Sequence, residues 1–277
     1  MAASQDGCIC CAPAEIQMRV TVSDRLKAAL AHPLTRNLSI DDPETTMIRS
    51  EIIREKLFLR RIYQSWYRLL TENIPPGEGQ VVEIGSGAGF LKELYSTAIT
   101  SEVFHSVNID IVFNAKSMPF KAGSLRSLLL VDVLHHIPDP AAFFSEATRC
   151  VKSGGRCLMV EPWNTGWSRW VYTHLHHEPF DVNGGWSIPA TGPLSGANGA
   201  LPWILFERDR EIFSRKFPEW RISEITPMMP LVYLLSGGIS LRSLLPVWSY
   251  PLFRKAETSF GIEKKAAMFA MIILDRL

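Results

Sequence analysis

The chain has 277 residues, of which 47% are hydrophobic and 21% are charged, and its net charge is +1. This near-neutral balance argues against a nucleic-acid-binding protein, because neutralising phosphates requires a clustered basic surface. The sequence has no uninterrupted apolar run of about 18 residues or more, so no membrane-spanning helix is expected.

Residues 1–40 are predicted to form a partly disordered tail. They begin MAASQDGCICC, which lacks the basic start and apolar core of a secretory signal. Three of the five cysteines (Cys8, Cys10 and Cys11) lie here without a second cysteine cluster. Free thiols in a reducing, cytoplasmic setting fit this odd count, and CxCC alone is a poor zinc motif.

Residues 41–277 are predicted to form one domain in which helices and strands alternate. Apolar residues recur at helical spacing over 46–73, and NIPPGEG ends this helix. Strand-length apolar runs follow: VVEI (81–84), SLLLV (127–131), RCLMVEP (156–162) and AMFAMIIL (267–274). RISEITPMM (221–229) is expected to be the sixth strand. FLKELYS (90–96), 141–151 and 208–217 have helical patterns. This alternation predicts an α/β fold with a parallel sheet covered on both faces.

Three glycines follow the first strand within five residues, in VVEIGSGAGFLKEL (81–94). In a strand–turn–helix unit this turn lies at the carboxyl edge of the sheet, where doubly wound folds bind ligands. Glycine lets a ligand approach the main chain there. A nicotinamide-type GxGxxG turn would need glycine at position 90, which is Phe90, so that interpretation fails on spacing.

An acidic residue followed by GxGxG resembles motif I of the class I S-adenosylmethionine-dependent methyltransferases. Residues 116–162 are similar to that family's run from the LPF-type turn, through the LHH-type end of the fourth strand, to the GG turn. AMFAMIILDRL is similar to its closing antiparallel strand, and the resemblance is clearest over 79–163. It implies a doubly wound, mostly parallel seven-stranded sheet, and S-adenosyl-L-methionine as the methyl donor.

The resemblance also implies the donor-binding residues. Glu83 would face the methionine ammonium, above a backbone cradle made by the glycine turn. A second acid would bind both ribose hydroxyls; spacing favours Glu102, with Asp110 as the alternative. Asn114–Ala115 replaces the Asp–Ala pair that often contacts adenine, and Asp132 would lie beside the sulfur. The predicted donor site is therefore Glu83, Gly85, Ser86, Gly87, Gly89, Phe90, Glu102, Asn114, Ala115 and Asp132.

Histidines are the candidate catalytic residues. His135 and His136 follow the fourth strand, and a histidine that titrates near neutrality can take a proton from an acceptor hydroxyl. Alternatively, one of them packs against the following turn, IPDP. HLHHEPFD (174–181) offers metal-ligand chemistry, but its spacing matches no helix-borne zinc pair, so no metal is assigned. An acid–base or acceptor-binding role for one member of this cluster, such as His177 with Glu178, is favoured over a metal.

Two insertions, at about 164–203 and 230–256, exceed what the minimal fold needs and are expected to set acceptor specificity. Trp163, Trp167 and Trp170 could face the sulfonium, pack an apolar acceptor, or cover the sheet edge. GPLSGANGALPW (192–203) could bind an anionic or sugar-like acceptor through backbone N–H groups, or form turns. The second insertion, apolar but broken by glycine and proline, fits a lid or a segment lying on a membrane.

The sequence therefore predicts an enzyme that methylates a large apolar or amphipathic acceptor, such as a natural product, a lipid or a lipid-linked sugar. Oxygen is the favoured nucleophile, because the three histidines would otherwise have no role. An N- or C-methyltransferase of a small metabolite is one alternative, and a non-catalytic cofactor-binding or membrane-surface protein is another. A cytoplasmic location is expected, with peripheral membrane contact as an option and no nucleic-acid partner.

Overall fold

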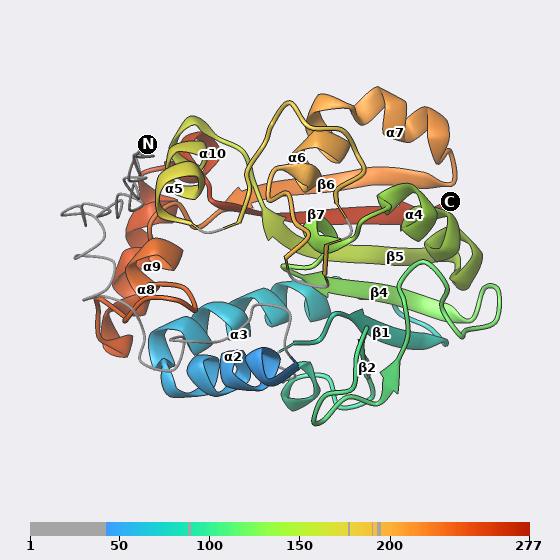
Figure 1. The fold of residues 1–277 in the computed structure, drawn as a ribbon, viewed down its shortest axis with the longest axis horizontal. Helices are drawn as coiled ribbons and strands as arrows, with labels where there is room; N and C mark the ends of the chain where they lie inside the picture. The colour runs from blue at the N-terminus through green and yellow to red at the C-terminus, as the bar shows by residue number, and fades with distance from the viewer. Residues whose placement is uncertain (1–42, 88–89, 177, 190, 193–194) are drawn as a thin grey trace, which may run out of the picture.

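The structure is a computed structural model that describes residues 43–87, 90–176, 178–189, 191–192 and 195–277 (Figure 1). Within these ranges the strands form a seven-stranded sheet of order β3-β2-β1-β4-β5-β7-β6. β7 runs antiparallel to β5 and β6, and the other strand pairs are parallel. The strands are β1 (Gln80–Ile84), β2 (Ile99–Glu102), β3 (Ile111–Val112), β4 (Leu125–Val131), β5 (Val151–Pro162), β6 (Trp220–Met228) and β7 (Phe269–Arg276). The predicted doubly wound sheet is confirmed.

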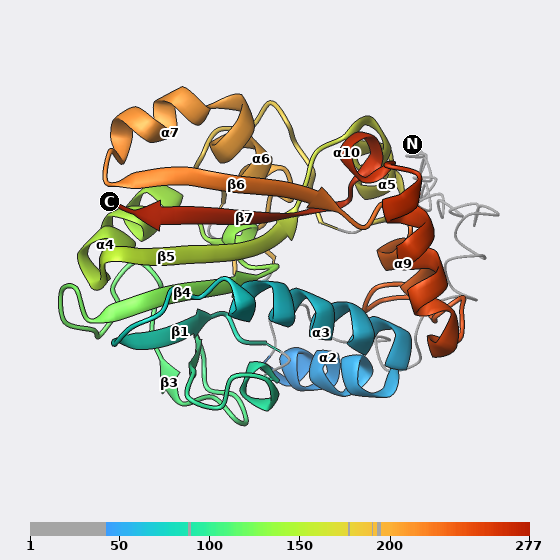
Figure 2. The same ribbon diagram turned by 180° about the vertical axis from the view of Figure 1, so that it is seen from behind.

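Helices cover both faces of the sheet (Figures 1 and 2). The longer ones are α2 (Pro43–Glu55), α3 (Leu57–Glu72), α4 (Pro140–Cys150), α5 (Gly166–Leu175), α7 (Arg210–Lys216) and α9 (Tyr250–Ser259). Shorter turns are η2 (Leu91–Glu93), η3 (Leu134–His136), α6 (Leu201–Trp203), η4 (Ile204–Arg208), α8 (Val232–Ser236), η5 (Val247–Ser249) and α10 (Glu263–Ala266). Alternate strand residues point to opposite faces. Leu129 of β4 therefore packs in the core under α3, and Leu128 in the core under α4 and α7.

Two predicted helices differ in the structure. Residues 46–73 form two helices rather than one, because Lys56 leaves the helical conformation (φ −80°, ψ 81°) between α2 and α3. The Lys56 ammonium is buried there and donates to the carbonyls of Gly238 and Leu241. Residues 90–96 form only the single turn η2, because the chain enters β2 at Ile99 and leaves no length for a full helix.

Both insertions lie at the carboxyl edge of the sheet, where β4 and β5 end (Figures 1 and 2). The first contains a regular helix, α5, which the sequence patterns did not indicate. The second contains α8, η5 and α9. They touch each other, since the indole Nε1 of Trp167 donates to the carbonyl of Pro230 at 2.7 Å. No helix in the described ranges is long and apolar enough to cross a membrane. The tail cysteines lie outside these ranges.

Candidate functional site

The glycine turn leaves β1 with two residues in the left-handed backbone region, Gly85 (φ 63°) and Gly87 (φ 46°). A Cβ on Gly85 would lie 2.7 Å from the side chain of Val133, so this glycine is required by packing within the protein. A Cβ on Gly87 would meet only the Gly85 carbonyl, at 3.8 Å. The space beside Gly87 is therefore open to a ligand. Gly89 lies outside the described residues.

Glu83 is the acidic residue of the turn, and its side chain is buried at the end of β1. Burial raises the pKa of its carboxyl to about 7, although hydrogen bonds with Tyr67 and Ser86 act in the opposite direction. Its Oε2 has no hydrogen-bond partner among the described residues. An unpaired buried carboxylate oxygen is costly, so this atom fits a site that receives a cation such as an ammonium group.

The two candidates for the second acid have different surroundings. Glu102 ends β2, and its Oε1 accepts a hydrogen bond of 2.7 Å from the Gly87 N–H, which places it against the glycine turn. Burial raises the pKa of Glu102. Asp110 instead accepts from the Thr100 N–H at 2.9 Å and pairs with Lys92 in a more exposed position. Glu102 is thus the acid beside the open space.

Three further predicted donor residues lie around the same edge. Asn114 follows β3, and its Oδ1 accepts from the Lys116 N–H at 3.0 Å, while Ala115 packs against the core. Phe90 is buried against Tyr67, with 4.9 Å between ring centroids, and so supports the turn from the core side. Only the Phe90 backbone is left to face a ligand.

Asp132 ends β4 in the left-handed region (φ 62°), an uncommon conformation for a residue with a side chain. Its N–H donates to the Val160 carbonyl at 2.8 Å, which fixes the backbone at the junction of β4 and β5. Burial raises the pKa of its carboxyl to about 7, while the charge on His135 acts in the opposite direction. Backbone strain of this kind is concentrated at functional sites.

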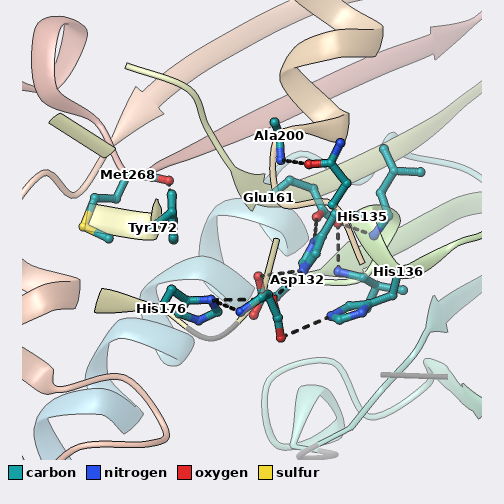
Figure 3. Close-up of polar contacts among 12 residues, drawn as sticks. Asp132, His135, His136, Glu161, Tyr172, His176, Ala200 and Met268 are labelled. Carbon is teal, nitrogen blue, oxygen red and sulfur yellow. Dashed lines mark hydrogen bonds and ion pairs between the residues drawn. The ribbon is translucent and has the colours of Figure 1, made fainter. Parts of the chain in front are cut away.

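A polar cluster lies next to Asp132 (Figure 3). His135 is fully buried in η3, and its Nδ1 is 2.8 Å from Oε2 of Glu161, at the end of β5. The other oxygen of Glu161 accepts from the N–H groups of Val133 (3.0 Å) and Leu134 (2.7 Å). Glu161 therefore fixes the imidazole and its turn. Sequence reasoning missed it, although an acid inside the apolar run RCLMVEP was the available signal.

The first insertion supplies Glu178 to this cluster. Its carboxylate lies 3.5 Å from Nε2 of His135 and 3.8 Å from Nε2 of His136. The Nδ1 of His136 is 3.3 Å from the Gly196 carbonyl, and the two histidine rings are 4.2 Å apart between centroids. The Nδ1 of His176 is 3.9 Å from Glu178. The cluster thus joins residues from η3, β5 and the insertion.

The positions of the other two histidines of HLHHEPFD are as follows. His174 lies on the outside of α5, where its Nδ1 contacts the Trp170 carbonyl at 2.8 Å and its ring stacks on Trp170. His177, the third predicted catalytic histidine, lies outside the described residues.

The charges of the cluster differ from those of the free side chains. Burial lowers the pKa of His135, but its hydrogen bond with Glu161, the nearby Glu178 carboxylate and the charge of Asp132 raise it well above its ordinary value. Burial, with the neighbouring charge of His135, lowers the pKa of His136 to about 3. The pKa of Glu178 lies well below its ordinary value: burial would raise it, but the three histidines outweigh that effect. At neutral pH, His136 is therefore the neutral imidazole.

A small cavity of about 20 Å³ lies between Asp132 and Glu178. Its remaining wall includes Tyr172, Phe180, Tyr233 and Phe269, drawn from both insertions and β7. The cavity is therefore polar at one end and aromatic at the other. Sequence reasoning missed these aromatic residues because their spacing alone does not show which face of α5 or α8 is turned inward.

Trp163, Trp167 and Trp170 do not line this cavity. Trp163 is buried in the core under α4 and α7. Trp167 and Trp170 stack on each other, with 5.9 Å between ring centroids, and Trp170 is half exposed. They cover the sheet edge and join the insertions, which was the alternative interpretation.

The described part of the glycine-rich loop 192–203 supports the histidines from behind. The Asn198 N–H donates to the His135 carbonyl at 3.0 Å, and the Gly196 carbonyl faces His136. Ala197 and Asn198 are buried. These residues form turns that hold η3, and they do not present a row of N–H groups to an acceptor.

Comparison with known proteins adds independent findings. Residues 82–159 match the model of a methyltransferase domain. No curated protein sequence matches the chain significantly. A possible histamine N-methyltransferase from Thermotoga maritima is 16% identical over 83% of this chain and 99% of its own, with a TM-score of 0.52. A geranyl diphosphate C-methyltransferase from Streptomyces coelicolor A3(2) is 16% identical over 90% and 92%, with a TM-score of 0.49.

Proposed function

We propose that this chain, a class I S-adenosylmethionine-dependent methyltransferase by its domain match over residues 82–159, methylates a hydroxyl oxygen of a large apolar or amphipathic small molecule. The donor supplies a methyl group already activated on a sulfonium. The protein must therefore align the acceptor, remove its proton and exclude water. The observation that carries the proposal is the polar cluster of His135, His136 and Glu178, which adjoins Asp132 and an aromatic wall.

The donor site fits the residues at the ends of β1, β2 and β4. The unpaired Oε2 of Glu83 suits the methionine ammonium, and the open space at Gly87 suits the ligand's approach to the backbone. Glu102 has a carboxylate against the glycine turn for the two ribose hydroxyls. Asn114 would contact the adenine amino group, and Asp132 would border the reacting end.

Within the cluster, His136 has the chemistry of a general base. It is neutral at neutral pH, and its Nε2 faces Glu178, whose charge would stabilise the imidazolium formed by proton transfer. His135 is fully buried and held by Glu161. We therefore assign His135 a positioning role: it holds Glu178 and η3 in place. His177 remains a candidate base.

The aromatic half of the cavity wall favours an apolar acceptor. Tyr172 and Phe180 stack with 4.8 Å between centroids, and Tyr233 contacts Phe269 at 4.6 Å. A cavity of about 20 Å³ holds no large acceptor, so part of its wall would move to admit one, and the 230–256 segment, which supplies Tyr233, is the part we propose. This segment would then act as a lid that closes over the acceptor.

The experiment is a screen of candidate acceptors with methyl-labelled donor, followed by mass and magnetic-resonance analysis of the product. We expect an O-methylated product, and a turnover about 100-fold lower in His136→Ala with nearly unchanged donor affinity. His174→Ala is the matched control, because this histidine lies outside the cluster. A methylated nitrogen or carbon in the product would contradict the proposal. Equal turnover in the two variants would remove His136 from the mechanism.

A second proposal concerns the source of the acceptor. Several large apolar side chains of the second insertion and the turn after it are exposed: Leu244, Trp248, Leu252 and Phe260. An apolar surface beside a lid suits a membrane from which an amphipathic acceptor could enter the site. We therefore propose peripheral membrane contact through this surface.

A further inference from the structure

The polar cluster contains an atom that the acid–base mechanism does not use. Nε2 of His135 is buried and has no hydrogen-bond partner in the described part of the chain. Its nearest carboxylate oxygens belong to Glu178, at 3.5 Å, and Asp132, at 3.9 Å. Both distances exceed a normal hydrogen bond. A buried nitrogen that lies beyond hydrogen-bond distance from both neighbouring carboxylates requires a physical explanation.

Three ligand atoms converge at this point. One ligand atom from each of His135, His136 and Glu178 lies within 4.8 Å of the other two. Nε2 of His135 is 3.5 Å from Oε2 of Glu178, and Nε2 of His136 is 3.8 Å from Oε1 of the same carboxylate. Ligand atoms around a tetrahedral Zn²⁺ ion lie about 3.4 Å apart. Small side-chain movements would therefore bring all three atoms into coordination range.

The outer contacts of both histidines match those of metal ligands. A ligating histidine normally directs its second ring nitrogen to a carboxylate or a backbone carbonyl, which orients the ring. Nδ1 of His135 is 2.8 Å from the Glu161 carboxylate, and Nδ1 of His136 is 3.3 Å from the Gly196 carbonyl (Figure 3). Both Nε2 atoms are thereby turned toward Glu178.

From this geometry we propose that His135, His136 and Glu178 bind one divalent transition-metal ion. Two imidazoles and one carboxylate suit Zn²⁺ and similar ions, whereas Mg²⁺ and Ca²⁺ prefer oxygen ligands. Of the three residues, Glu178 lines the small cavity together with Asp132 and His176, so an acceptor in this cavity would approach the ion from the side of Glu178. An oxygen of the acceptor can then coordinate the ion.

The role of the ion deepens the proposed function and rests on it, although its binding does not. With the ion bound, His136 is a ligand and the ion takes over the base's task, because coordination makes a hydroxyl more acidic. The acceptor O–H bond breaks and its proton passes to water. The oxygen pair forms the new C–O bond, and the electrons of the broken C–S bond return to sulfur.

The experiment uses the full chain carrying Cys8→Ser, Cys10→Ser and Cys11→Ser, because cysteine thiolates are zinc ligands and would complicate the titration. Chelator-treated protein is titrated with Zn²⁺ by calorimetry and with Co²⁺ by visible absorption. We expect one ion per chain, with affinity at least 100-fold lower in His136→Ala and Glu178→Gln. Glu161→Gln should lose about 10- to 100-fold, as an outer partner does. His174→Ala should bind like the parent.

Donor binding by each variant checks that it is folded. Absence of saturable binding, or equal affinity in the parent, Glu178→Gln and His136→Ala, overturns the metal site. Full O-methylation by chelated protein overturns the ion's role while leaving the proposed function intact. Ion binding in a protein that forms no O-methyl product supports the site and refutes the proposed function.

Discussion

Several buried carboxylates lie at the ends of neighbouring strands. Their hydrogen-bond partners indicate which of them serve the fold and which suit a ligand. Glu161 binds two backbone N–H groups and His135, so it is satisfied within the protein. Glu83 keeps an oxygen without a partner in the described residues, and Glu102 faces the open side of the turn. Because an unsatisfied buried carboxylate oxygen destabilises the fold, Glu83 suits a cationic ligand. Glu102 accepts from the Gly87 and Val103 N–H groups, and it suits a ligand by its position beside Gly87.

Glu102 and Asp110 are distinguished by one pair of variants. Replacing Glu102 by alanine should weaken donor affinity by about 1.5 to 3 kcal/mol, because hydrogen bonds from a charged group to the ribose are lost. Asp110→Ala is the control, since its carboxylate already binds Thr100 and Lys92. Calorimetric titration measures both. Weaker binding only in Asp110→Ala would reverse the assignment.

Glu83 should make the stability of the donor-free protein depend on pH. Its pKa is raised by burial from 4.5 to about 7, so between these values the folded state binds more protons than the unfolded state. Stability therefore falls as pH rises through this window, by at most about 3 kcal/mol. Glu83→Gln should remove this component in chemical denaturation at a series of pH values.

Donor binding offers a second measurement on the same residue. Because an ammonium favours the ionised carboxylate, the parent's affinity should increase as pH rises toward and past about 7. A parent and a Glu83→Gln variant with the same pH profile would rule out this carboxylate as the ammonium partner.

At the scale of elements, several contacts hold the second insertion in place. The buried Glu257 of α9 accepts from the N–H groups of Leu231 and Val232 at 2.7 Å, where α8 begins. Lys56, between α2 and α3, donates to the carbonyls of Gly238 and Leu241. The stack of Tyr233 on Trp66 joins the insertion to the core. Deleting the segment would therefore expose the core, so point variants are the better test of the lid.

Lys56→Met should loosen the lid without disrupting the sheet. Two carbonyls lose their donor, and the local opening of residues 237–242 should become about 10-fold more frequent. Hydrogen exchange resolved by peptide measures this opening. Lys255→Met is the control, because that side chain is exposed on α9. Unchanged exchange in Lys56→Met would mean that the lid does not depend on this contact.

At the scale of the whole molecule, exposed apolar residues gather on the insertion that also forms part of the cavity wall. Trp248 is 70% exposed, Leu252 62% and Phe260 79%. They belong to the end of the molecule formed by η5 and α9, away from α7 (Figure 2). Arg242 and Lys255 are near them in sequence, and basic residues beside apolar ones favour an anionic membrane surface.

The membrane prediction can be tested by flotation with vesicles containing anionic lipid. The parent should float with the vesicles, and the double variant Trp248→Ser, Leu252→Ser should float several-fold less, because its buried apolar area is smaller. Ile212→Ser on α7 removes a similarly exposed apolar side chain elsewhere and serves as the control. Equal flotation of all three proteins would locate the contact elsewhere or exclude it.

Local patterns in the sequence determined the sheet, the glycine turn and the donor class. The period of apolar residues identifies strands, and glycine spacing distinguishes this turn from a dinucleotide turn, because both signals come from residues adjacent in the chain. The same reasoning placed Lys56 inside one long helix. It missed the break there because Lys56 is bound by the carbonyls of Gly238 and Leu241, which are far away in the sequence.

Only the tertiary structure decided how the site is assembled. His135 meets Glu161 because β4 and β5 pair in a particular register, and Glu178 arrives from an irregular insertion. The inward turn of Tyr172 and the outward turn of Trp170 depend on which face of α5 packs on the sheet. Such contacts join residues far apart in the chain, and neither spacing nor composition specifies them. They are set by the packing free energy of the whole fold.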